Sequence, residues 1–341
     1  MKANHSNKEV NYNDFLSAAE MGKLWATYVG NTLGKCVISY FLKHVDDSDI
    51  KKVLDYAMGL SEKYIKKMED LFQKKNFPTP IGLTEEDVNL EAPRLFYDEF
   101  YLHYMQYLAK AGMSIYSAAI PLVTRKDVRQ FFAEALDGTV KLLSDVHDLL
   151  KSKGTLNTPP PMPPPKGVHF VQKQDFLNGF IGDVRPLHGL EVAHLFDNLN
   201  NDITSKALIN GFMQVAKDEK VKKFLERGEN INRKHIEKLS QKLSEAHLPS
   251  PPLLDHLVTK STTSPFSDKL MTFHKIDMFS MKIRSYANGA SLNGRRDIGS
   301  LYGKCMLDVS LYVEDGANIM IEKGWMEQPP EVIDREDLTS K

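Results

Sequence analysis

Six residues in the second half of the chain have the side chains of metal ligands and lie where leucine or isoleucine is expected in a helical pattern. They are Glu191, His194, His235, His274, Asp277 and Asp315. Glu191 and His194 are three residues apart and would share one face of a helix. Carboxylate and imidazole groups on facing helices are how helical bundles build di-metal centres. The set therefore predicts a site for iron, manganese or zinc.

The same residues also suit a structural role. Buried histidines and carboxylates can hydrogen-bond one another and fix the register of the helices that carry them. The set contains fewer glutamates than the usual di-metal pattern. The sequence leaves both interpretations open, and it identifies no catalytic residue.

The path of the chain decides whether the six residues can meet. If four helices simply alternate in direction, the residues lie within about 10 Å of one level, at a rise of 1.5 Å per residue. If the connection after the second helix crosses the bundle, the spread grows to roughly 22 Å. One metal could not then be shared, because each ligand must lie about 2 Å from it. The connection is long enough for either path.

The helices that would position these residues belong to a tandem repeat. Glu191 follows Glu20 by 171 residues, and Arg295 and Asp297 follow Arg125 and Asp127 by 170. Because the offset holds across the whole chain, each copy is a complete domain rather than a solenoid unit.

The first copy lacks the same set of ligands. Its equivalent positions hold Glu20, Lys23, Tyr64, Tyr104, Tyr107 and Asp145. Lysine and tyrosine are poor ligands for these divalent metals, so any metal is expected in the second copy alone.

Each copy contains four helical patterns, recognised by apolar residues that recur every three or four positions. The patterns cover residues 13–43, 49–76, 94–119 and 126–153, and then 185–215, 219–246, 265–288 and 296–323. Alternating strand patterns are nearly absent. The predicted fold is all-α, a tandem duplication of a four-helix bundle, with bundles at 12–155 and 171–330.

A proline-rich stretch, Thr158–Lys166, lies in the predicted linker, 156–170. Such runs favour an extended, semi-rigid polyproline conformation. The two bundles are therefore expected to be spaced apart.

Composition excludes several classes of protein. The formal net charge is −1 and no basic stripe is present, so no nucleic-acid partner is expected. No stretch approaches the roughly 20 apolar residues of a membrane span, and the polar N-terminus does not resemble a signal peptide. Cys36 and Cys305 occupy non-equivalent positions, so free thiols in a reducing, cytoplasmic compartment are expected.

Two further motifs carry a resemblance. The break Leu248-Pro-Ser-Pro-Pro252 and the closing Glu322-Lys-Gly-Trp325, followed by Pro329-Pro330, resemble an uncharacterised family of tandem ferritin-like bundles from endospore-forming bacteria. That family is similar to spore coat protein F. The resemblance implies a ferritin-like bundle with a crossover between the second and third helices.

The resemblance also implies a non-catalytic, spore-associated structural or interaction protein. Its partners would be other spore proteins or a second copy of the chain. The alternative from the six polar residues is a metal-binding or di-metal oxidase-type protein that acts through the second bundle.

Overall fold

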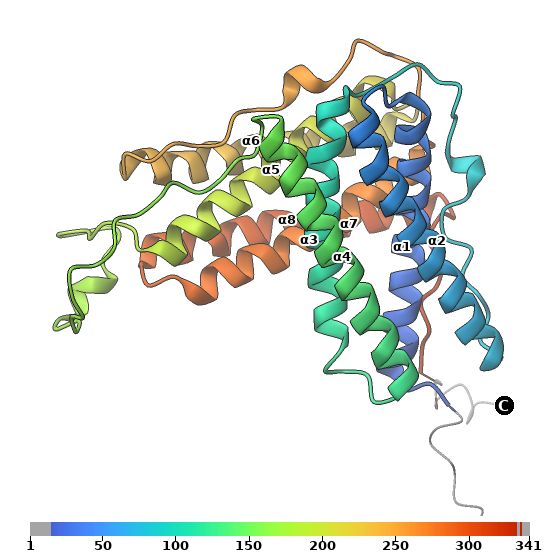
Figure 1. Cartoon of the computed structure of the whole chain (residues 1–341), viewed down its shortest axis with the longest axis horizontal. Coiled ribbons are helices and arrows are strands. Elements are labelled where there is room, and N and C mark those ends of the chain that lie inside the picture. Colours follow the sequence, from blue (N-terminus) through green and yellow to red (C-terminus); the bar gives the residue numbers. More distant parts are fainter. Residues whose placement is uncertain (1–14, 333–334, 336–341) are drawn as a thin grey trace, which may run out of the picture.

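The computed structural model describes residues 15–332 and residue 335. Eight α-helices follow one another in this part of the chain, four in each repeat (Figure 1). They are α1 (Ala18–His44), α2 (Ser48–Lys74), α3 (Asp98–Ala119), α4 (Lys126–Ser152), α5 (Gly189–Val215), α6 (Glu219–Glu245), α7 (Asp268–Leu292) and α8 (Arg296–Glu322). The all-α fold and the tandem repeat are confirmed, and residues 12–14 of the predicted first bundle lie outside the described residues.

Short 3-10 turns accompany the connections. They are η2 (Glu85–Asp87), η3 (Gln174–Leu177) and η4 (Asp255–Leu257). Capping side chains set the helix starts. Ser17 accepts a hydrogen bond from the backbone N–H of Glu20, and Glu20 accepts one from the N–H of Ser17. This reciprocal pair satisfies two donors that a helix start otherwise leaves unpaired.

The second and third helices of each repeat are joined by a crossover. In the second repeat, Asn198 near the start of α5 contacts Ser285 near the end of α7. The ring of Phe212 at the end of α5 lies 5.7 Å from that of His274 at the start of α7. Helices α5 and α7 are therefore antiparallel, and the segment between α6 and α7 must cross the bundle. This is the path expected to spread the six polar residues.

The two crossover segments hold the repeats together. Ser267 N–H donates to the carbonyl of Asp87 at 2.9 Å, and Tyr97 N–H donates to that of Leu257 at 3.0 Å. Each bond is the counterpart of the other under the 170-residue offset. Asn89 to Pro265 and Thr259 to Leu95 form a second such pair, at 2.8 and 2.9 Å. The repeats are thus related by an approximate two-fold axis, like the subunits of a symmetric dimer.

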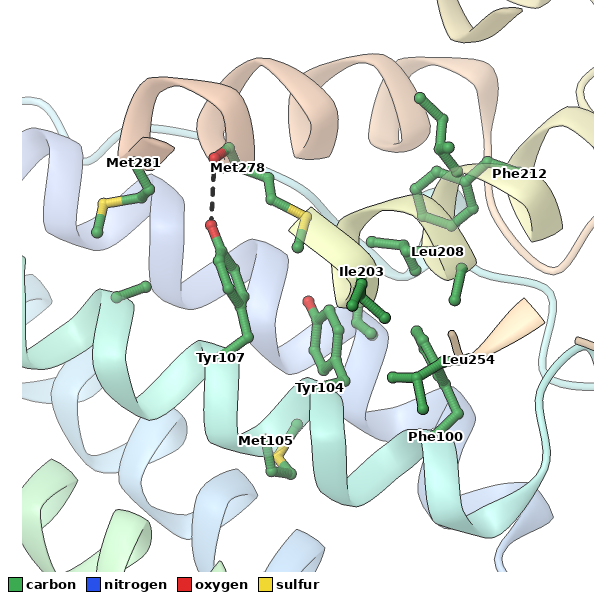
Figure 2. Close-up of a cluster of buried hydrophobic side chains, with 14 of the residues drawn as sticks. Phe100, Tyr104, Met105, Tyr107, Ile203, Leu208, Phe212, Leu254, Met278 and Met281 are labelled. Carbon is green, nitrogen blue, oxygen red and sulfur yellow. Dashed lines mark hydrogen bonds between the residues drawn. The ribbon is translucent and has the colours of Figure 1, made fainter. Parts of the chain in front are cut away.

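The axis passes between α3 and α7, where equivalent residues meet. The hydroxyl of Tyr104 is 2.6 Å from Nε2 of His274, which is 170 positions later. Tyr107 donates to the carbonyl of Met278 at 3.3 Å, and both tyrosines are packed among apolar side chains of the second repeat (Figure 2). One cluster of buried apolar residues runs through both repeats.

The expectation that the linker spaces two separate bundles is therefore wrong. The bundles cross and share a core (Figure 1), because burying more apolar surface outweighs the stiffness of an exposed proline run. The proposed boundaries 12–155, 156–170 and 171–330 as separately folding units stay a prediction.

Other features of the described part agree with the sequence. Cys36 and Cys305 are free and buried, and burial raises the pKa of the Cys36 thiol to about 11 and that of Cys305 to about 12. No helix among the described residues has the length and apolar character needed to cross a membrane.

Candidate functional site

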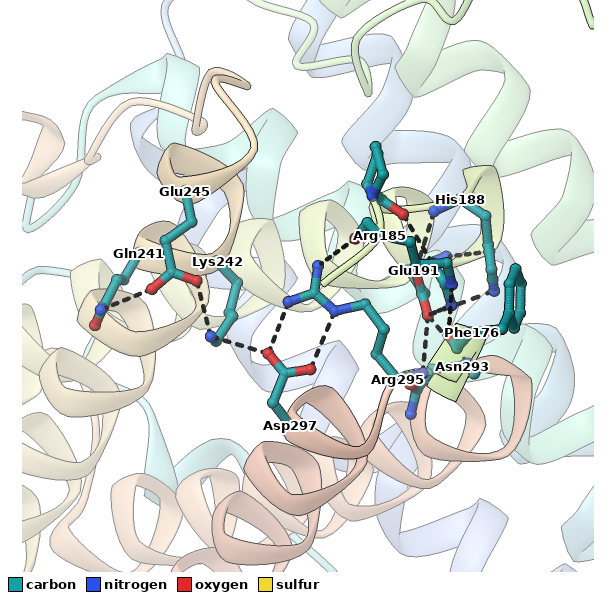
Figure 3. A network of polar contacts seen from close by, with 12 residues as sticks. Phe176, Arg185, His188, Glu191, Gln241, Lys242, Glu245, Asn293, Arg295 and Asp297 are labelled. Atoms are coloured by element: carbon teal, nitrogen blue, oxygen red, sulfur yellow. Dashed lines mark hydrogen bonds and ion pairs between the residues drawn. The ribbon is translucent and has the colours of Figure 1, made fainter. Parts of the chain in front are cut away.

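Glu191 joins the starts of two helices. It occupies the first turn of α5, and its carboxylate accepts hydrogen bonds from the backbone N–H groups of Gly294 and Arg295, just before α8, at 3.0 and 3.1 Å. Arg185 approaches the two carboxylate oxygens at 2.7 and 2.8 Å (Figure 3). Glu20 does the same in the first repeat with Thr124 and Arg125, at 3.0 and 2.8 Å.

The environment of Glu191 keeps it ionised. Burial alone would raise its pKa, but the hydrogen bonds from Arg185 and from backbone N–H groups lower the pKa below its ordinary value. These donors occupy the carboxylate, so Glu191 acts as a connector between helix starts. His194 lies part-buried in the next turn and forms no hydrogen bond or ion pair with any described residue.

His235 belongs to a polar network in the core of the second repeat. Its Nδ1 lies 3.0 Å from the hydroxyl of Tyr286, and its Nε2 lies 3.3 Å from Asp308. Tyr286 donates to Asp202 at 2.7 Å, and Lys282 forms an ion pair with the same carboxylate at 2.8 Å. Burial lowers the pKa of His235, so the imidazole is neutral at physiological pH.

Lys282 links two buried polar side chains of this network. Its Nζ also donates to the side-chain oxygen of Asn232. Asp202, Lys282 and Asn232 are all buried. None of the three is among the residues predicted from the sequence, although Asp202 and Lys282 each interrupt an apolar helical pattern.

Lys275, two turns before Lys282 on α7, is buried without a carboxylate partner among the described residues. Its Nζ donates to the carbonyl and hydroxyl oxygens of Ser205 at 3.1 and 2.9 Å. Burial lowers the pKa of Lys275 well below its ordinary value, and the charge of Lys282 lowers it further.

The remaining candidates point elsewhere. His274 faces Tyr104 of the first repeat, and burial lowers its pKa to about 3. Asp277 lines a cavity between the helices of the first repeat, and burial raises its pKa. Asp315 is half-exposed and pairs with Arg227 on α6.

The structure does not bring the six candidates together. His274 is packed beside Phe212, near the end of α5. Glu191 lies on α5 too, 21 residues before Phe212, which corresponds to roughly 31 Å along the helix. Within the described ranges, no group of three or more His, Cys, Asp or Glu side chains could hold a metal ion. Metal binding through these six residues stays a prediction, and it would require another arrangement of the helices.

Comparisons with known proteins give one family. The family model described as "Protein of unknown function (DUF3231)" matches residues 6–168 and again residues 175–338. Each match covers one repeat. A search of curated proteins found no match.

Among solved structures, the chain is similar to a protein of Bacillus halodurans C-125 that is provisionally described as a spore coat protein. The two are 17% identical, with a TM-score of 0.40 over 44% of this chain and 98% of that one.

Proposed function

We propose that this chain, which belongs to the DUF3231 family, is a non-catalytic structural or interaction protein that associates with a second copy of itself. The observation that carries the proposal is an exposed apolar segment between the repeats, residues 166–184. The spore association rests on the resemblance noted in the sequence.

Several large apolar side chains of the segment 166–184 are exposed to solvent. Five of its apolar residues have exposed fractions between 61% and 90%: Val168, Phe170, Val171, Phe180 and Ile181. The segment projects from the helices at the left of Figure 1. Large apolar side chains gathered on one exposed segment in this way favour an interaction site.

A second copy of the chain is the partner that suits this surface. In a symmetric dimer the same patch meets itself, so a patch of high net charge would repel its copy. The segment carries two lysines and two aspartates, and its formal charges cancel. Two phenylalanines bury about 150–250 Å² each, a large part of the roughly 800 Å² per partner in a stable interface.

The oligomeric state tests this function. Light scattering coupled to size-exclusion chromatography should find a dimer for the wild type and a monomer for the triple variant V168S/F170S/I181S. The control is L307S/I321S, which replaces two apolar α8 side chains that are 61% and 62% exposed, and should stay dimeric. A wild type that remains monomeric at high concentration, or a triple variant that remains dimeric, rejects the proposal.

The location of the protein tests the spore association separately. A fluorescently tagged chain produced in an endospore-forming bacterium should collect at the developing spore. A signal that stays evenly spread through the cell during sporulation contradicts this part of the proposal and leaves the dimer test unaffected.

A further inference from the structure

The first repeat contains a partly open cavity of about 90 Å³ between its helices. Helices α1 to α4 form most of its wall, and Asp277 reaches it from α7 of the second repeat. Small residues leave the space open: a Cβ atom added to Gly30 would meet no heavy atom within 4 Å. Because about 10–15 Å³ of such cavity volume holds one water, the cavity has room for a group of several heavy atoms.

Three polar groups at this cavity have no hydrogen-bond partner among the described residues. The hydroxyl of Thr27 is fully buried and unpaired. The hydroxyl of Ser61 and the carboxylate of the part-buried Asp277 also line the cavity and form no hydrogen bond or ion pair with any described residue. Thr27 is only 3% exposed and Ser61 only 6%. Buried polar groups in proteins are nearly always hydrogen-bonded. The buried hydroxyl of Thr27 and two further polar groups without a partner, on three different helices at one cavity, therefore favour a ligand that could bind them.

The unpaired groups favour a donor. A carboxylate only accepts hydrogen bonds, and hydroxyl oxygens can accept them. Asn31, also in the wall, already donates its amide N–H groups to the carbonyl of Thr27 and to the hydroxyl of Tyr116, which leaves its amide oxygen as a further acceptor. The complementary group is one with several donors and a positive charge, and a primary ammonium has three N–H donors.

The second repeat shows how such a wall is filled. Lys282 stands at the position equivalent to Gly112, which lines the cavity. The ammonium of Lys282 contacts Asp202 and Asn232. Under the 171-residue offset these two are the equivalents of Asn31 and Ser61. In the second repeat a lysine side chain thus extends from the position of Gly112 toward the equivalents of Asn31 and Ser61. In the first repeat the glycine provides no such side chain, and a Cβ atom at Gly112 itself would meet Thr139 at 2.9 Å.

We propose that the cavity of the first repeat binds a small primary alkylammonium compound of about four or five heavy atoms, with Asp277 as its counter-ion. The alkyl part replaces the missing lysine side chain and lies against the apolar wall. Asp277 supplies the negative charge that Asp202 supplies in the second repeat, so the site is complete only when both repeats are packed together.

The test uses the full-length chain and n-butylammonium, which has the atoms of a lysine side chain beyond Cα. Saturation-transfer NMR and calorimetry should detect saturable binding, with titration into the millimolar range because so small a ligand binds weakly. Butan-1-ol, which has the same number of heavy atoms and no charge, should bind at least tenfold more weakly.

Three variants locate the site. D277N should weaken butylammonium binding at least tenfold, whereas the control D315N, which removes a surface carboxylate, should leave it unchanged. G30L should fill the cavity and abolish binding without lowering the Tm, because its side chain enters open space. Circular dichroism checks that each variant is folded, and S61A provides a second, milder change of the wall.

The proposal is overturned if butan-1-ol binds as well as butylammonium, or if the folded D277N and S61A variants both bind as the wild type does. Binding that persists in G30L places the ligand elsewhere and also overturns it. So does the absence of saturable binding, which would mean that the cavity holds only water.

Discussion

Replacing Lys275 by methionine should stabilise the protein, whereas the same change at Lys282 should destabilise it. Both lysines are buried on α7, seven residues apart. Lys282 pairs with the buried carboxylate of Asp202. Lys275 instead contacts uncharged groups: the oxygens of Ser205, the sulfur of Met278 and the ring of Phe279. The two residues have the same side-chain amino group, and only Lys282 has a carboxylate partner.

The magnitude for Lys275 follows from its titration. Burial lowers the pKa of its amine well below the ordinary value, which is about 10.4 in an unfolded chain. Between the folded and unfolded pKa values the unfolded chain binds a proton that the folded chain does not. Stability therefore falls as the pH falls through this window, by about 1.4 kcal/mol per pH unit. From pH 9 to pH 7 the loss is up to about 2.7 kcal/mol.

Methionine at position 275 has no charge to lose, so K275M should lack this part of the pH dependence and be more stable at pH 7. K282M would instead leave Asp202 buried without its cation, at a cost of about 3–5 kcal/mol. The amine of Lys282 also has a lowered pKa because of burial. Lys282 is present in both the wild type and K275M, so the difference between the two chains reports on Lys275 and on its coupling to Lys282.

Urea unfolding at pH 7 and pH 9 measures the effect. The free energy of unfolding of K275M should change less between the two pH values than that of the wild type, with an unchanged m-value. K304M, at an exposed position of α8, is the control and should match the wild type. If K275M is destabilised at both pH values, or keeps the full pH dependence, the assignment of Lys275 as an unpaired buried amine is refuted.

Three further predictions concern the connections and the polar candidates. Cleavage at an engineered protease site within 158–166 should leave two fragments that elute together, because the repeats share a core; fragments that separate as folded halves would support the boundaries 12–155 and 171–330. Glu191→Gln should destabilise the chain by about 1.5–3 kcal/mol at pH 7. Hydrogen bonding holds the folded-state pKa of Glu191 below its ordinary value, so its stabilisation is present above about pH 4.3 and is lost as the pH falls through the folded pKa. The free energy of unfolding of the variant should therefore change less with pH in this acid range than that of the wild type. The same pH dependence in both chains contradicts this. Elemental analysis tests the metal hypothesis. Because His235 is already hydrogen-bonded to Tyr286 and Asp308, His235→Tyr should not change the metal content. Stoichiometric iron, manganese or zinc that is present in the wild type and lost in this variant would establish a site.

The polar candidates show where sequence reasoning succeeds and where it stops. Interruption of an apolar pattern marked Glu191, His235 and His274 as buried, and all three are buried. The pattern could not say which neighbour each would face. His274 faces the first repeat and Glu191 faces the start of α8. Helix α7 packs against α5, α6 and α8 and also against α1 of the first repeat, so it has no single inward face.

The sequence by itself determined the eight helices and the tandem repeat. The helices follow from the local spacing of apolar residues, and the repeat follows from a constant offset between equivalent residues. Both can be read directly from the sequence. Tertiary structure alone decided that the crossovers pair about a two-fold axis and that the repeats share a core. It also decided that Asp277 completes a cavity of the other repeat. Contacts between residues about 170 positions apart depend on how whole helical faces fit together, and no periodicity within one helix records that fit.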